Sequence, residues 1–98
     1  MKKAEPVSEI TVGTTAVSTV ACGLISIILL ADGTNEASIK LYDHAASATG
    51  DVKKALAIKA ASNPEYAVYT PCKSDSFANG IVAVVAGTGA KAYISIEA

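Results

Sequence analysis

Short apolar and β-branched runs recur along this chain, and turn-forming residues separate them roughly every 8–12 positions. Runs of this length and spacing are typical of antiparallel β-sandwiches and barrels. The pattern predicts strands at residues 9–14, 17–21, 23–31, 37–42, 54–60, 65–70, 81–86 and 91–97. We therefore expect an all-β protein with one antiparallel β-sandwich domain over residues 9–98, jelly-roll-like and built from about seven or eight short strands.

Two of these runs alternate between apolar and polar residues at every step. Successive side chains of a strand point to opposite faces, so such alternation predicts a half-buried antiparallel strand. The predicted inward positions are Ala37, Ile39 and Leu41 in one run and Ala92, Ile94 and Ile96 in the other.

Residues 52–61 fit two kinds of element. Their alanine, leucine and lysine content favours a helix, whereas Leu56, Ile58 and Ala60 alternate as in a strand. We favour the strand, which the Asn63-Pro64 pair would end.

Glycine-containing sequences mark the tight turns. Asp32-Gly33 and Asn79-Gly80 combine residues that tolerate a positive φ. Gly87-Thr88-Gly89 is short enough to join the last two strands as a hairpin.

Residues 1–8 are predicted to form an extended N-terminal arm, because half of them are polar, they contain a proline and they show no periodicity. An arm that becomes ordered on a partner adds contact area. The charged residues Lys2, Lys3, Glu5 and Glu9 are therefore candidate contacts at a partner interface. Their alternative role is plain solubility.

The composition leaves this chain with a modest core. Hydrophobic residues make up 51% of it but aromatic residues only 5%, so alanine, valine and isoleucine supply most of the apolar content. Charged residues make up 17%, against about 25% in typical soluble domains. A small domain with so few charges leaves apolar surface exposed, which predicts that another protein or further copies of the chain cover it.

Charge and hydropathy exclude two classes of partner. The net charge is −1 and the basic residues are dispersed, so nucleic-acid binding is not expected. The longest apolar stretch, residues 24–31, is too short for a membrane helix. Lys2 and Lys3 precede polar residues instead of the apolar segment of a signal peptide, so neither a leader nor membrane association is expected.

Few residues offer catalytic or metal-binding chemistry. A catalytic group would have to use the single histidine, His44, with its neighbour Asp43, and a small enzyme built on this pair is one hypothesis. We favour a turn at the end of a strand, in which Asp43 caps backbone groups and His44 is solvated. Residues 87–91 lack the spacing of a phosphate-binding loop. No catalytic residue, metal site or cofactor is predicted.

The cysteines and tyrosines each leave two interpretations open. Cys22 and Cys72 are expected to be unpaired thiols made in a reducing cytosol, and a single disulfide is the alternative. The tyrosines are expected to be sheet residues with packed rings, although together they would suit a stacking platform for sugars. They are Tyr42, Tyr66, Tyr69 and Tyr93.

Two segments resemble small virion proteins of tailed bacteriophages. The first is Ile39-Lys40-Leu41-Tyr42-Asp43 with the small-residue loop at 45–50, similar to a "hydrophobic-x-Leu-Tyr-Asp, small-residue loop, Gly" stretch. The second runs from Phe77-Ala78-Asn79-Gly80 through a strand to Gly87-Thr88-Gly89-Ala90 and a closing strand. With the strand rhythm, the resemblance covers about two-thirds of the chain. The helix-like 52–61 stretch and the two cysteines depart from it.

The resemblance implies a β-sandwich component of a virion. The expected function is that of a capsid decoration or cement protein, which binds the major capsid protein, stabilises the shell of a tailed phage and is often a homotrimer. It would be made in the host cytoplasm and sit on the outer capsid surface. The family carries no catalytic residues. The alternative is an adhesion module of a head fibre, neck or tail that binds carbohydrate or a host surface.

Overall fold

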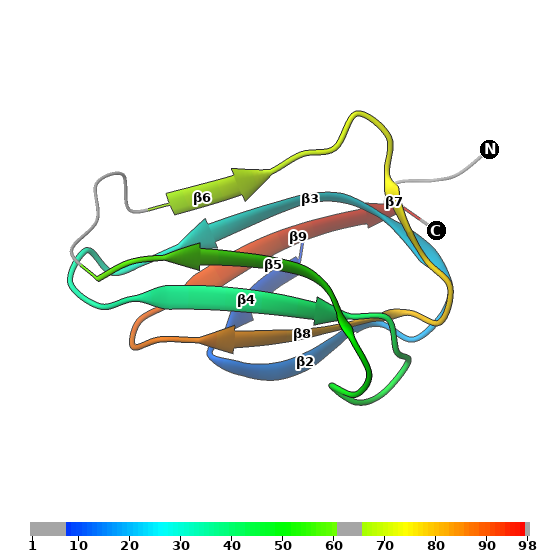
Figure 1. The fold of residues 1–98 in the computed structure, drawn as a ribbon, viewed down its shortest axis with the longest axis horizontal. Coiled ribbons are helices and arrows are strands. Elements are labelled where there is room, and N and C mark those ends of the chain that lie inside the picture. Colours follow the sequence, from blue (N-terminus) through cyan, green and yellow to red (C-terminus); the bar gives the residue numbers. More distant parts are fainter. Residues whose placement is uncertain (1–7, 61–65, 98) are drawn as a thin grey trace.

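Two antiparallel sheets packed face to face make up the computed structural model, which describes residues 8–60 and 66–97 (Figure 1). In order across the first sheet, the strands are β1 (Ser8–Thr11), β9 (Lys91–Glu97), β3 (Cys22–Leu30) and β6 (Tyr66–Tyr69), and β7 (Asp75–Phe77) also pairs with β3. The second sheet contains β2 (Gly13–Ser18), β8 (Ile81–Ala86), β4 (Ala37–Tyr42) and β5 (Val52–Ile58). The described residues contain no helix, and the predicted all-β sandwich is confirmed.

The topology is that of one long antiparallel hairpin folded over itself. Moving outward from the loop at residues 43–51, β4 pairs with β5, β3 with β6 and β7, β2 with β8, and β1 with β9. These pairs alternate between the second and the first sheet. This arrangement of paired strands is a jelly roll, as the sequence pattern indicated.

The largest differences from the predicted strands lie at two places, and the bounds of several other strands, such as β5, shift by one or two residues. The structure has nine strands because β7 was not predicted. In addition, the first two strands divide at Val12 instead of near residue 15. Gly13 has a φ of 130°, which lets the chain leave the first sheet and enter the second. Strand β1 begins at Ser8, and residues 1–7 of the predicted arm lie outside the described residues.

The core lies between the sheets, and every buried side chain of the described residues is apolar. All six predicted inward positions of β4 and β9 are buried. In β5, Leu56 and Ile58 pack on the core, so the strand interpretation of this segment is confirmed. Full burial of each large aliphatic or aromatic side chain stabilises the fold by about 1.5–3 kcal/mol. Tertiary burial therefore outweighs the weak helix propensity of β5.

Candidate functional site

The Asp43 carboxylate connects the end of β4 to the turn before β8, at one end of the sandwich. It accepts hydrogen bonds from the backbone N–H groups of Ala78 (3.2 Å) and Asn79 (2.8 Å), in the turn before β8. The Asn79 hydrogen bond, with that of Ala78 and the nearby Lys53 ammonium, holds the pKa of Asp43 below its usual value. The carboxylate therefore joins two segments that lie 36 positions apart.

His44 organises the next loop instead of meeting Asp43. Its Nδ1 atom accepts hydrogen bonds from the backbone N–H groups of Ala46 and Ser47, both at 3.0 Å. An accepting Nδ1 carries no proton, so the proton of the neutral ring is on Nε2. Thus Asp43 caps backbone groups as expected, whereas His44 is half-buried and bonded to its own loop. The structure gives the two side chains different partners.

The glycine-rich segment at 87–91 forms the β8–β9 turn, as predicted, with the Ala90 N–H donating to the Gly87 carbonyl at 3.1 Å. Gly87 has a φ of 112°, and a Cβ atom there would lie 2.1 Å from the Glu36 carbonyl oxygen. Within residues 8–60 and 66–97, no cluster of three or more histidine, cysteine or acidic residues could hold a metal ion. The same residues include no helix that is long and apolar enough to span a membrane.

Both cysteines are free thiols in different surroundings. Cys22 is buried at the start of β3, and burial raises the pKa of its thiol. Cys72 is exposed in the connection between β6 and β7. The expectation of unpaired thiols agrees with this structure.

The tyrosines do not form one platform. Tyr66 and Tyr93 lie on the outer face of the first sheet, and Tyr42 lies on the outer face of the second. Tyr69 packs against the core, and its hydroxyl donates to the Asp75 carboxylate at 2.5 Å. The four rings therefore occupy three different surroundings.

Side chains close the edge where β5 lies beside β6 and β7, a feature the sequence analysis missed. The Lys54 ammonium is 4.1 Å from the centre of the Tyr69 ring and 4.0 Å from the Asp75 carboxylate. The Lys53 ammonium is 4.6 Å from the centre of the Phe77 ring. Cation–π contacts and ion pairs thus join the two sheets where strand hydrogen bonds do not. The adjacent Lys53 and Lys54 are the sequence feature that could have indicated these contacts.

An exposed apolar surface crosses three strands of the first sheet. Ile28 of β3 lies beside Val68 of β6 and Tyr93 of β9, and Leu30 of β3 lies beside Tyr66 of β6. Ile28, Tyr66 and Val68 are 38%, 54% and 53% exposed. We call these five residues the β9–β3–β6 face. A contiguous apolar surface of this kind commonly marks a contact with another protein.

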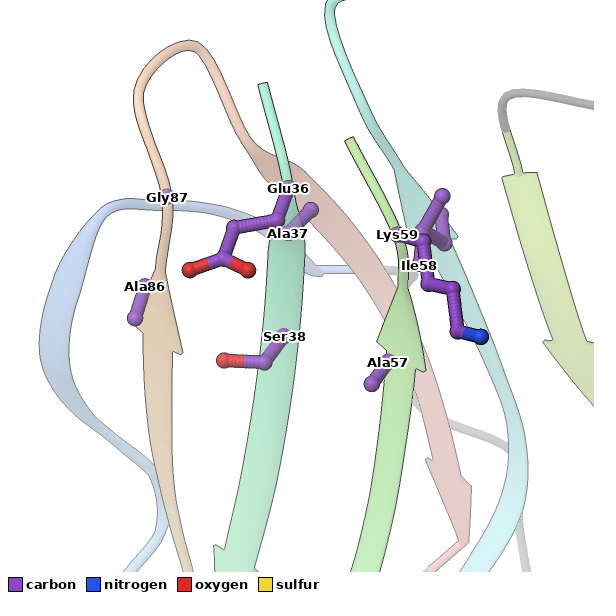
Figure 2. Close-up of a pocket in the computed structure, with 8 residues that line it drawn as sticks. All are labelled: Glu36, Ala37, Ser38, Ala57, Ile58, Lys59, Ala86 and Gly87. Atoms are coloured by element: carbon purple, nitrogen blue, oxygen red, sulfur yellow. The ribbon is translucent and has the colours of Figure 1, made fainter. Parts of the chain in front are cut away.

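A shallow hollow of about 340 Å³ lies on the outer face of the second sheet, at one end of β8, β4 and β5 (Figure 2). Its lining includes Ser38, Ala57 and Ala86, whose side chains are small, and the charged Glu36 and Lys59. Its lining is therefore mostly apolar, with one acidic and one basic side chain.

The structure places one of the four predicted interface residues. Glu9 is exposed in β1, and its carboxylate accepts a hydrogen bond from the Tyr93 hydroxyl at 2.9 Å, which raises the pKa of Tyr93. Lys2, Lys3 and Glu5 lie outside the described residues.

Comparison with known proteins adds no relative. No family model, curated protein or solved structure matches this chain.

Proposed function

We propose that this chain is a structural virion protein that binds the major capsid protein and stabilises the shell of a tailed phage as a decoration, or cement, protein. Its place would be the outer capsid surface. The observation that carries the proposal is the β9–β3–β6 face, because it offers exposed apolar side chains on a rigid sheet.

This face has the properties of a docking surface for a protein. Its centre is aliphatic and aromatic, whereas Glu9 and Lys91 bring charge to its β1 and β9 side. Protein interfaces commonly combine an apolar centre with a polar rim. Because the side chains stand on paired strands, little backbone conformational entropy is lost when a partner covers them.

The two segments that resemble phage virion proteins are one physical unit in this fold. Asp43, which closes the first segment, holds the backbone of Ala78 and Asn79 in the second. A Cβ atom on Gly80 would lie 2.4 Å from the Ser18 carbonyl oxygen, so the turn also needs its glycine. The resembling residues therefore support each other structurally in this chain.

The test uses shells assembled from the major capsid protein alone and purified chain added back. Val68→Lys places a charge within the face, directly beside Ile28, on a side chain that is already 53% exposed, so the fold should persist. We expect at least tenfold weaker shell binding and loss of protection against heat. Thr14→Lys, on the exposed outer side of β2 in the other sheet, is the matched control and should bind within about twofold of wild type.

The proposal also requires that shells gain stability from the protein. Decorated shells should rupture at a higher temperature, or at lower salt, than bare shells. Equal robustness of decorated and bare shells would overturn the cement function, and unimpaired binding by Val68→Lys would show that another surface makes the contact.

A further inference from the structure

The hollow on the second sheet has a floor of unusually small side chains. Ser38 of β4 lies in register with Ala86 of β8 on one side and Ala57 of β5 on the other. All three belong to the outer face, because their chain neighbours Ala37, Ile58 and Val85 are buried in the core. Large side chains at these positions would fill the space, so this row leaves room for a group from outside.

Opposite charges flank this floor. In Figure 2 the Glu36 carboxylate leans over the gap between β4 and β8, whereas the Lys59 chain extends from β5 on the side away from β8. Both residues are exposed, and neither makes an ion pair with another residue in the described part of the chain. The hollow therefore lies between one acid and one base, neither of them paired within residues 8–60 and 66–97.

We propose that a second copy of this chain covers the hollow in a two-fold contact. The aliphatic part of Lys59 from each copy would lie over Ala57, Ser38 and Ala86 of the other copy, and its ammonium would meet the Glu36 carboxylate there. Lysine suits this position because its apolar stem covers small side chains while the charged end stays near water.

Charge complementarity indicates that the molecule covering the hollow is a second copy of the chain. A patch with an acid on one side and a base on the other is complementary to itself, because a two-fold rotation brings each acid against the other copy's base. Both pairs form in one contact, so the assembly closes with two copies. Lys40, the next outward residue of β4, lies two positions beyond Ser38, at the rim of a contact centred on the hollow.

This inference is independent of the proposed function. The capsid-binding surface is the β9–β3–β6 face of the first sheet, and the two-fold contact uses the outer face of the second sheet. One copy therefore has room for a neighbour and a shell at the same time.

Charge reversal in the full chain tests the contact by sedimentation equilibrium at low salt. Glu36→Lys and Lys59→Glu should each lower the dimer association constant at least tenfold, because each creates two repulsive pairs. An equimolar mixture of the two variants should form dimers with about the wild-type constant, since the copy with two lysines meets the copy with two glutamates. Lys91→Glu, on the first sheet, is the matched control and should dimerise like wild type.

Three results would overturn the proposal. They are a wild-type chain that stays monomeric near millimolar concentration, dimers or trimers that persist in both single variants, and a mixture that fails to restore association. Circular dichroism and thermal unfolding establish that each variant is folded. Shell binding, measured on the same samples, is expected to survive both reversals, so failure of the capsid proposal would be seen separately.

Discussion

At the scale of single residues, Asp43 connects the end of β4 to a turn that is distant in sequence. Its carboxylate supplies the acceptor for two backbone N–H groups of the turn before β8. We expect Asp43→Ala to lower the free energy of unfolding by about 1–3 kcal/mol, because both donors lose a charged acceptor. Asp43→Asn, which keeps one acceptor oxygen, should cost less. Urea unfolding measures both, and Asp51→Ala, at an exposed loop position, is the control.

The lowered pKa of Asp43 predicts an acid dependence. Backbone hydrogen bonds, led by that from Asn79, favour the ionised carboxylate in the folded state, so the unfolded chain takes up a proton first as the pH falls. The contribution is complete above the ordinary aspartate pKa of 3.8 and is lost as the pH falls through the lower folded value. Stability measured from pH 6 to pH 2 should therefore drop less steeply in Asp43→Asn. Identical slopes would mean that Asp43 does not contribute.

The two thiols should differ in reactivity. Thiolates react and thiols do not, and burial raises the pKa of Cys22 while Cys72 is exposed. We expect dithionitrobenzoate at neutral pH to titrate one thiol in the native chain and both in urea. Native Cys72→Ser should then show none. Rapid reaction of Cys22 in that variant would mean that the start of β3 opens readily.

Sequence predicted the type of role of Asp43 but not its partner. A polar residue just after an alternating strand predicts a cap on nearby backbone. The capped groups instead belong to Ala78 and Asn79, and no local pattern specifies a contact across that separation. His44 shows the same limit, because its loop hydrogen bonds depend on how residues 45–47 turn.

At the scale of elements, the glycine turns make the sharpest prediction. Gly80 and Gly50 both have positive φ, 134° and 84°, but only Gly80 has backbone oxygens where a Cβ atom would stand. Gly50→Ala should cost about 1–2 kcal/mol for backbone conformation alone. Gly80→Ala should cost at least about 3 kcal/mol, because the Ser18 carbonyl must also move. Equal losses in thermal or urea unfolding would show that the turn relaxes freely.

Strands were predicted correctly where apolar and polar residues alternate clearly. The prediction failed where a strand forms because it pairs with a segment distant in sequence. The alternating runs gave β4 and β9 with their buried faces. Strand β7, with Asp75 and Ser76, shows no such pattern, and it is a strand because Cys22–Leu24 of the long β3 lies beside it. The exposed β9–β3–β6 face was harder still to predict, because Ile28 and Leu30 lie in a run where the neighbouring residues are also apolar, so the sequence does not show which of them face solvent.

At the scale of the whole molecule, the jelly roll is a hairpin whose pairings become less local with distance from the loop at 43–51. Ala37 pairs with Ile58 across that loop, whereas Glu9 and Tyr93, in β1 and β9, are 84 positions apart. Closing a longer loop costs more conformational entropy. The composition and the spacing of the apolar runs predicted the sandwich. They did not predict that β9 lies between β1 and β3, because that position depends on how the long hairpin folds into two sheets.

The same geometry predicts which part of the sandwich forms first. Strands β4 and β5 close the shortest loop, so we expect their pairing to be present in the folding transition state, and the pairing of β9 with β1 and β3 to follow. Ile39→Val in β4 and Ile94→Val in β9 remove the same methylene from fully buried sites and should each cost about 0.5–1.5 kcal/mol. In stopped-flow experiments Ile39→Val should mainly slow folding, whereas Ile94→Val should mainly speed unfolding. If Ile94→Val slowed folding as much as Ile39→Val, the first and last strands would already be paired at the barrier, and the loop at 43–51 would not nucleate the fold.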